Sequence, residues 1–322
     1  MLERVDQIAK AILYEGYMLY PYRPSSVKNR QRFNFGVLYP RAYSEAQGAS
    51  EPFSLRTECL VNGDADTLVE IRVRFLHLQT RQSLDQTHPK SDWQEAVERA
   101  VILPSLSISQ LSSEDWRQDF MFGSVSDRGI EQSQTDFLLR TETIHGAVEV
   151  RAQRVGEKIF KLTLSVHNTT ELPVQESRDQ ALMRSLVSTH AVIGVTAGEF
   201  VSLLEPPAEL QSLAAGCENV GAWPVLVGDP GQRDTMLASP IILYDYPQIA
   251  PESAGDLFDG TEIDEILSLR IMTLTDDEKR EIRESDERAR LILERTESMP
   301  VEQFMKLHGA LRGLRPLAEK TP

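Results

Sequence analysis

The sequence predicts an α+β fold that is mostly β: an antiparallel β-sandwich or open barrel with an N-terminal helix and a helical C-terminal segment. Segments of alternating apolar and polar residues, separated by turn signals, recur over about residues 50–172. This alternation is typical of strands with one buried and one wet face. Apolar residues at helical spacing near the start of the chain, and helix-capping residues near its end, predict the flanking helices.

The first element is a helix over residues 3–14. Its apolar residues recur at helical spacing and form one stripe: Leu2, Val5, Ile8, Ala9, Ile12 and Leu13. We expect this stripe to dock on the rest of the protein. Acids and bases are mixed along the helix, without the basic start and apolar run of a secretory signal, so no export is expected.

The next segment, residues 14–43, is rich in Tyr, Phe, Arg and Pro and carries no acid between Pro21 and Arg41. We call it the basic aromatic stretch and expect an ordered loop with a short strand at residues 33–38. Because Arg and aromatic residues are enriched in interface hot spots, part of the stretch is predicted to bind a partner protein. The predicted partner-binding residues are Tyr17, Tyr20, Tyr22, Arg23, Arg30, Arg32, Phe33, Phe35 and Arg41. Alternatively, the rings pack the loop on the sandwich and the Arg residues pair with the acidic C-terminal half.

Alternating segments at residues 55–61 and 68–78 predict the first two strands. Asn62-Gly63 lies between them and predicts a hairpin turn, because both residues tolerate the positive φ values of tight turns. In the second strand the apolar residues lie on one side, and Arg72 and Arg74 lie on the other. One face of this hairpin is therefore expected to be core.

The later strands are predicted from the same pattern. They cover residues 100–108, after a short helix or bulged approach at 91–99, and residues 143–152, 158–167, 191–195, 200–204, 223–227 and 240–244. Val155-Gly156-Glu157 and Ala197-Gly198-Glu199 are expected to be hairpin turns, and Gly228-Asp229-Pro230-Gly231 a turn between the last two strands.

From residue 261 onward the pattern is helical. Thr261 is expected to cap a helix over residues 262–272, and Thr275 with Glu278 forms the capping-box pattern of a helix that runs to about residue 298. Pro300 opens a last helix.

The chain therefore divides into four segments. They are residues 1–50, the N-terminal helix and basic aromatic loop packed on the core; 51–172, an antiparallel β domain; 173–260, a β-rich second region; and 261–322, the C-terminal helices.

Composition excludes several functional classes. The formal net charge is −15, from 49 acids against 34 Lys and Arg, and it disfavours nucleic-acid binding. The apolar runs are far shorter than the roughly 20 residues of a membrane-spanning helix. Cys59 and Cys217 are too few for a disulfide framework, and two reduced thiols fit a cytoplasmic protein.

The sequence lacks recognisable catalytic and metal-binding motifs. Its six His residues show no metal-ligand spacing, and the GxSxG, Walker and GxGxxG patterns do not occur. We therefore predict no catalytic residue, no metal site and no cofactor. The alternative is a site assembled from residues distant in sequence, such as His190, Cys217 and acids near Asp245.

Four stretches carry a resemblance to a known family. They are YEGYMLYPYRPSSVKNRQRFNFGVLYPRAYSE, NVGAWPVLVGDPGQRDTMLASPIILYDYPQIAPESAGDLFDGTEIDEILSLR, TLTDDEKREIRESDERAR and MPVEQFMKLHG. Together they resemble an uncharacterised bacterial family encoded in gene clusters for uptake nickel–iron hydrogenases of the actinobacterial type. The resemblance covers nearly the whole chain. It implies a pathway by gene neighbourhood and supplies no catalytic residues.

We therefore expect a non-enzymatic accessory protein that binds other proteins. The resemblance implies a hydrogenase subunit or a maturation factor as the partner, during hydrogenase assembly. Two alternatives stay open: an enzyme or metal carrier whose site is assembled from distant residues, and a permanent structural subunit of a complex.

Overall fold

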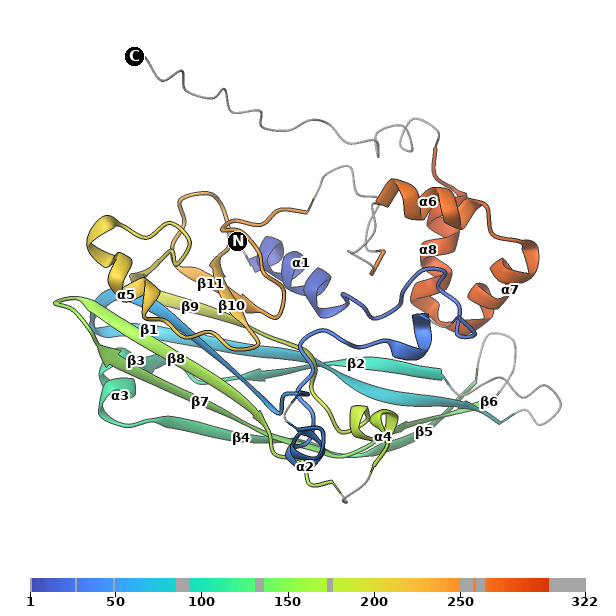
Figure 1. Cartoon of the computed structure of the whole chain (residues 1–322), viewed down its shortest axis with the longest axis horizontal. Helices are drawn as coiled ribbons and strands as arrows, with labels where there is room; N and C mark the ends of the chain where they lie inside the picture. The colour runs from blue at the N-terminus through green and yellow to red at the C-terminus, as the bar shows by residue number, and fades with distance from the viewer. Residues whose placement is uncertain are drawn as a thin grey trace, which may run out of the picture. The chain divides into compact units, whose positions relative to one another are not determined.

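A computed structural model of the chain describes residues 2–26, 28–48, 50–84, 93–130, 136–172, 176–249, 257–258 and 264–300 (Figure 1). The chain forms two compact units. The first contains Met1–Tyr17 and Gln31–Gln248, and the second contains Met18–Arg30 and Ile249–Pro322.

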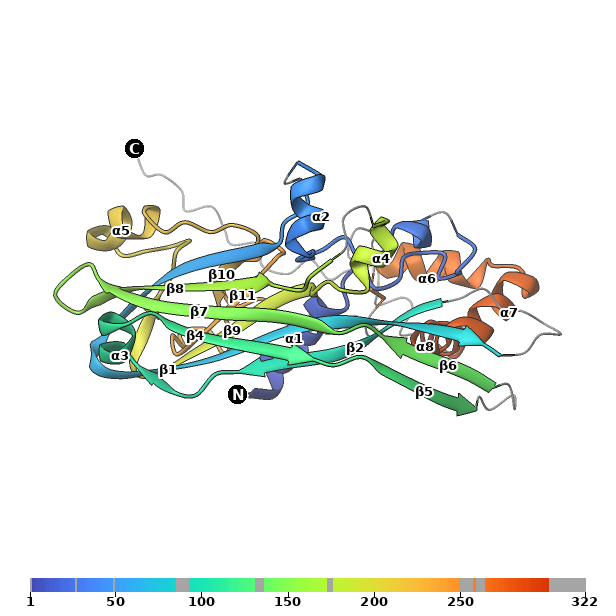
Figure 2. The same ribbon diagram turned by 90° about the horizontal axis from the view of Figure 1, so that it is seen from below.

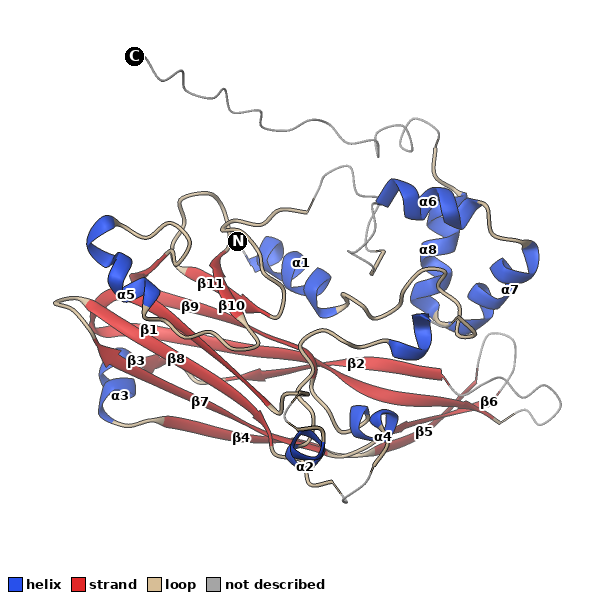
Figure 3. Ribbon diagram, in the orientation of Figure 1, coloured by secondary structure: helices blue, strands red, loops and turns tan. Residues whose placement is uncertain are grey.

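The first unit is built on one antiparallel sheet, which confirms the predicted fold class. In the described residues the sheet is 11-stranded and open, with the order β10-β11-β9-β1-β8-β7-β4; β2, β3 and β6 also pair with β1, and β5 pairs with β6. The strands are β1 (Ser54–Ser83), β2 (Trp93–Ile102), β3 (Leu106–Ser107), β4 (Trp116–Phe122), β5 (Val125–Ile130), β6 (Asp136–Thr141), β7 (Ile144–Arg154), β8 (Ile159–Asn168), β9 (Val187–Val201), β10 (Trp223–Leu226) and β11 (Thr235–Ser239) (Figure 3).

The strand β1 changes partners at a corner. Its first arm, residues 54–62, pairs with β8, whereas residues 68–81 pair with β3 and β2, and β9 runs beside both arms. Figure 2 shows β1 turning at the end of the sheet near α3 and returning alongside β2. The predicted hairpin at Asn62-Gly63 is therefore wrong, because the two arms pair with other strands and not with each other.

A wide bulge makes this corner. Gly63 pairs with Gly198 and Leu68 pairs with Thr196, so residues 64–67 of β1 face Ala197 alone. The hydroxyl of Thr67 donates to the carbonyl of Ala197 (2.8 Å) and accepts from the amide of Asp64 (2.9 Å). A Cβ on Gly198 would lie 2.7 Å from Cγ2 of Thr67, so the absent side chain makes room for the bulge.

The same bulge explains why the predicted hairpin at Ala197-Gly198-Glu199 is wrong. The strand β9 runs without interruption from Val187 to Val201. Gly63 and Gly198, which each suggest a turn in the sequence, are instead paired with each other across the β1–β9 ladder.

The core lies inside the coiled sheet. One apolar cluster takes residues from both arms of β1, such as Leu55 and Phe75, and adds the inward residues of β7, β8 and β9. Burial alternates along β8 as expected for a strand with one buried face. The two arms of β1 are thus tied together by core packing as well as by β9.

Helix α1 (Leu2–Leu13) confirms the predicted first element and its docking stripe. Val5, Ile8, Ala9 and Ile12 pack against β10 and β11 in a second apolar cluster. Asp6 adds ion pairs with the outer face of β1, at 3.7 Å to Arg72 and 3.5 Å to Arg74. Among the described residues, no helix has the length and apolar character that crossing a bilayer requires.

Other predictions in the first unit are partly correct. The β7–β8 hairpin and the turn at Gly228-Asp229-Pro230-Gly231 are present, but β11 begins at Thr235 and not at residue 240. The strand predicted at residues 33–38 is reduced to one bridge between Leu38 and Leu186. A short helix, α2 (Arg41–Ala46), precedes the first strand, and others connect later strands: α3 (Ile108–Ser113), α4 (Arg178–Leu182), η2 (Ala208–Leu210) and α5 (Gln211–Ala215).

The second unit contains the first three residues of η1 (Lys28–Gln31), together with α6 (Asp264–Met272), α7 (Asp276–Ser285) and α8 (Glu287–Glu297). The predicted capping box of Thr275 and Glu278 is confirmed at the start of α7. The predicted single helix is broken at Asp286, whose carboxylate accepts from the amide of Arg288 (2.8 Å) and caps α8. The predicted cap at Thr261 and the last helix after Pro300 lie outside the described residues.

Candidate functional site

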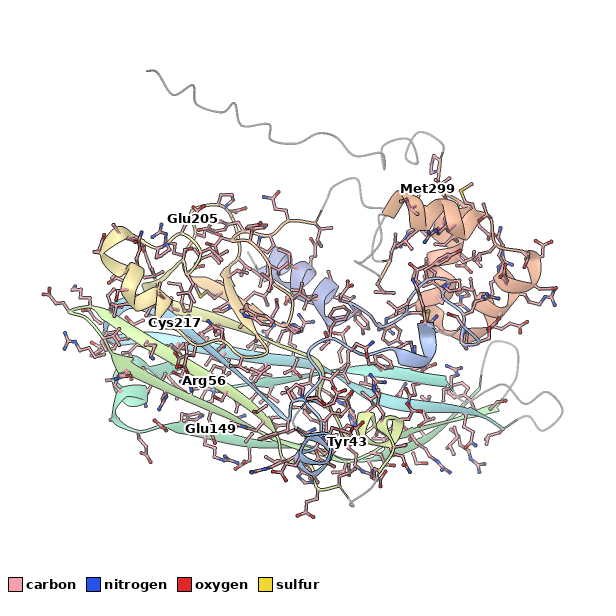
Figure 4. The ribbon with its side chains drawn as sticks, viewed as in Figure 1. Tyr43, Arg56, Glu149, Glu205, Cys217 and Met299 are labelled. Carbon is pink, nitrogen blue, oxygen red and sulfur yellow. The ribbon has the colours of Figure 1, made fainter. Side chains whose placement is uncertain are left out.

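A groove of about 840 Å³ opens on the first unit between α2 and the outer face of β4, β7 and β8. We call it the α2 groove. Its lining residues are Arg41, Ala42, Glu45, Phe53, Arg117, Glu149, His167, Asn168, Thr169, Thr170, Glu171 and Leu172. Tyr43 of α2 and Glu149 of β7 are labelled in Figure 4.

Helix α2 forms one wall and is anchored by its buried side. Tyr43 is buried and stacks on Tyr39, with ring centroids 5.1 Å apart. Burial raises the pKa of Tyr39 to about 12, although Arg178 partly opposes the rise, so this phenol stays neutral. The anchoring leaves the other side of α2 free to face the groove.

The groove side of α2 carries an exposed charged pair. Arg41 and Glu45 are one helical turn apart and form an ion pair of 2.7 Å, with 68% of the Arg41 side chain exposed. The guanidinium of Arg41 also lies 5.2 Å from the ring centroid of Phe53, which precedes β1. This cation–π contact holds a planar, charged surface at the mouth of the groove.

The floor is a row of polar and charged side chains across three strands. Arg117 on β4 is directly opposite Glu149 on β7 and forms an ion pair with it, and Arg117 also binds Asp119 at 2.8 Å. Nε2 of His167 on β8 lies 3.5 Å from Oε2 of Glu149. Hydrogen bonds with Asp119 and then with Glu149 raise the pKa of Arg117, which keeps this guanidinium charged.

The far wall is fixed by buried hydrogen bonds. The side-chain amide of Asn168 donates to the carbonyls of Leu38 (2.8 Å) and Arg184 (2.9 Å), and its oxygen accepts from the amide of Thr170 (2.9 Å). The hydroxyl of Thr170 joins the main chain of His145 through both its donor and its acceptor. The wall is therefore a preformed surface and not a loose loop.

Chemically, the groove offers mixed charge beside one aromatic face. Its cationic residues alternate with Glu45, Glu149 and Glu171, so it suits a ligand that carries both charges and not a purely anionic one. The pair of His167 and Glu149 has the residue types of an acid–base pair, but Glu149 is also bound by Arg117.

The sequence-predicted residues in the first unit are mostly held in internal contacts. Tyr17, Arg32 and Phe33 are buried, with the guanidinium of Arg32 4.5 Å from the Phe33 ring centroid and bonded to the carbonyl of Tyr17 (3.2 Å). The half-buried ring of Phe35 covers Gly16. Arg41 is the exception, because it is exposed and lines the α2 groove.

In the second unit, Tyr22 is buried and its hydroxyl donates to the carbonyl of Leu257 (2.7 Å). Arg23 forms ion pairs with Glu278 (3.1 Å) and Glu281 (3.8 Å), which is the acidic pairing of the alternative interpretation.

Two predicted residues remain. The ring of Tyr20 lies 5.5 Å from the guanidinium of Arg270, and the side chain of Arg30, in η1, lies outside the described part. Partner binding by this set stays a prediction, and Arg41 is the member placed in a groove.

The three residues proposed for a distant metal site have separate neighbours. His190 is fully buried and bonded to the carbonyl of Ser188 (2.9 Å), Cys217 contacts the carbonyl of Leu213, and Asp245 accepts from Ser202 and from the amide of Leu226. In the part of the chain that the structure describes, no group of three or more His, Cys, Asp or Glu is placed to hold a metal ion.

Arg117, Glu149 and His167 were not identified from the sequence, because there each resembles an ordinary polar residue on the solvent-exposed face of a strand. Only the register of β4, β7 and β8 brings them together. Comparison of the sequence with models of known protein families and with curated proteins gives no match.

Proposed function

We propose that this chain is a non-enzymatic accessory protein that binds other proteins in the cytoplasm through the α2 groove. The observation that carries the proposal is the exposed Arg41, stacked on Phe53 at the mouth of a preformed groove. Exposed Arg and aromatic side chains on rigid supports are the residues that concentrate binding energy at protein interfaces.

The charges of the groove support a protein partner over a nucleic acid. Acidic and basic side chains are interleaved on its walls and floor, so a partner segment with both charges can satisfy them in turn. The net charge of −15 would also repel a polyanion.

The partner we propose is a hydrogenase subunit or a maturation factor, because the sequence resembles a family encoded in hydrogenase gene clusters. Transient binding during assembly and permanent binding as a structural subunit use the same surface. Their difference lies in the dissociation rate and in whether the mature complex retains the chain.

A second candidate function rests on the contact between His167 and Glu149. A histidine 3.5 Å from a carboxylate in a groove of this volume can act as an acid–base pair toward a small molecule. This reading makes the chain an enzyme whose site is assembled from residues distant in sequence.

One purification tests the first candidate. The tagged chain is recovered from its native host beside the variants Arg41→Glu and Arg151→Glu, and co-purifying proteins are identified by mass spectrometry. Arg151 is the matched control, since it is an exposed arginine on β7 that does not line the groove. We expect the same partners with wild type and Arg151→Glu and their loss with Arg41→Glu. Equal recovery of partners from all three proteins would show that the α2 groove is not the partner-binding surface.

The same samples test the second candidate. A small molecule that remains bound to the wild-type chain and is lost from His167→Asn would favour the enzyme reading. Metal analysis belongs to the same experiment, because stoichiometric nickel, iron or zinc would favour a metal carrier.

A further inference from the structure

The strand β4 has one free edge. It pairs with β7 on one side, and on its other side the described residues supply no hydrogen-bond partner to its main chain. Trp116 and Met121 on this strand are 37% and 62% exposed. A free edge of this kind is a template for another strand, and native sheets usually block it with charge, proline or a covering segment.

The sequence of β4 is self-complementary in one register. When two copies pair antiparallel about a two-fold axis, facing residues must lie on the same face, so the axis passes through a residue paired with itself. With Gln118 on the axis, Arg117 faces Asp119 of the second copy, and Trp116 faces Phe120.

The neighbouring registers lack this complementarity. With Asp119 on the axis, two carboxylates face each other, which is destabilising in a cross-strand pair. With Phe120 on the axis, Asp119 faces Met121 and the opposite charges no longer meet. Of these three registers, only the one with Gln118 on the axis brings opposite charges of the two copies face to face.

We propose that β4 pairs antiparallel with β4 of a second copy of this chain, with Gln118 on the two-fold axis. The pairing extends the sheet across both copies and places Trp116 opposite Phe120 of the second copy. Arg117 already binds Asp119 and Glu149 of its own chain, and its guanidinium has the donors to add a carboxylate opposite.

The dimer is expected to be weak and salt-dependent. The contact consists mainly of one short strand ladder, well below the area of stable protein interfaces. Each copy also carries a net charge of −15, so the copies repel at low ionic strength. At physiological salt the Debye length falls to about 8 Å, which screens this repulsion more than the pairs in direct contact.

Sedimentation analysis from micromolar to millimolar chain tests the proposal with two charge reversals. Asp119→Arg places two like-charged Arg pairs at the contact, and Arg117→Asp places two Asp pairs there, so each variant alone is expected to be monomeric. An equimolar mixture of the two restores opposite charges at every position and is expected to form a heterodimer. Circular dichroism of each variant confirms folding.

A crosslink gives an independent readout that needs no charge change. Gln118→Cys is expected to form a disulfide-linked dimer on oxidation, because the two cysteines meet at the axis. The matched variant Met121→Cys, whose copies lie six positions apart along the ladder, is expected not to. Wild-type chain that stays monomeric at every concentration, charge variants that dimerise as well as wild type, or equal crosslinking at both positions would each overturn the proposal.

Discussion

Replacing Glu58 with Gln should destabilise the first unit by about 3 kcal/mol at neutral pH. The carboxylate of Glu58 is fully buried and is bound by Arg56, by Lys161 at 3.2 Å, by the amide of Glu218 at 2.9 Å and by the hydroxyl of Thr163 at 3.2 Å. Arg56 and Cys217, beside Glu218, are labelled in Figure 4. In Glu58→Gln, the side-chain amide would place an N–H donor where a carboxylate oxygen now accepts hydrogen bonds, and the negative charge would be absent.

The magnitude follows from the pKa of Glu58. Burial alone would raise this pKa, but the amide of Glu218, Arg56 and Lys161 outweigh burial and lower it from 4.5 to about 2. At about 1.4 kcal/mol for each tenfold change, the fall corresponds to about 3 kcal/mol. Because the folded-state pKa is depressed, this stabilisation is complete above pH 4.5 and is lost as the pH falls through 2.

Urea unfolding followed by tryptophan fluorescence measures the effect. Trp93, Trp116 and Trp223 all belong to the first unit, so the signal reports that unit. The difference between wild type and Glu58→Gln should be about 3 kcal/mol at pH 7 and should shrink as the pH falls toward 2.

Glu218→Gln is the matched control. Its side chain is 74% exposed and lies 3.6 Å from Arg56, so its loss should cost less than about 1 kcal/mol. Equal stabilities for Glu58→Gln and wild type at pH 7, or a difference that does not change with pH, would refute the reasoning.

Three further predictions concern two buried histidines, one close contact and one helix cap. Burial lowers the pKa of His77 and His190 from 6.5 to about 4, so each is neutral in the folded protein at a pH where it is protonated in the unfolded chain. As the pH falls from 6.5 through 4, each histidine should therefore lower the free energy of unfolding by about 3 kcal/mol. In urea unfolding over this pH range, His190→Gln should lose about 3 kcal/mol less than wild type. Gly198→Ala should cost about 1–3 kcal/mol because its Cβ meets Thr67, and Thr67→Ala should relieve part of that cost in a double-mutant cycle; additive effects would contradict the contact. Asp286→Ala should lower the stability of α8 by about 1 kcal/mol through loss of its cap, seen as faster amide exchange in α8 than in α7, and unchanged exchange would argue against the cap.

Local signals in the sequence were sufficient for several elements. The apolar stripe of α1, the hairpin of β7 and β8 and the capping box at Thr275 each depend on residues close together in the chain, and each is present. The open antiparallel architecture follows from the same alternation of apolar and polar residues.

The corner of β1 shows what local signals leave out. Asn62-Gly63 and Ala197-Gly198-Glu199 each have the composition of a tight turn, yet Gly63 and Gly198 pair with each other across a bulge. Their glycines are needed because the side chain of Thr67 occupies the space between the strands. A single sequence does not show that two turn signals are partners.

Only one residue of the candidate site was predicted from the sequence, because the site also depends on how strands pair. Arg41 was identified from its residue type and context, and it lies in the α2 groove. Arg32 has the same residue type but is buried, because the carbonyls of Tyr17 and Gln94 supply its acceptors. The position of the Gln94 carbonyl on β2 and the row of polar side chains across β4, β7 and β8 are set by strand register, which no local pattern encodes.

The most direct test of partner binding is site-specific crosslinking in the native host. A photo-crosslinking amino acid replaces Ala42, which is exposed on α2 and lines the groove, or Arg151, which is exposed on β7 outside it. We expect a covalent adduct with a discrete partner protein from position 42 and little or none from position 151. Adducts of equal yield at both positions, or none at position 42 while the partner still co-purifies, would contradict it.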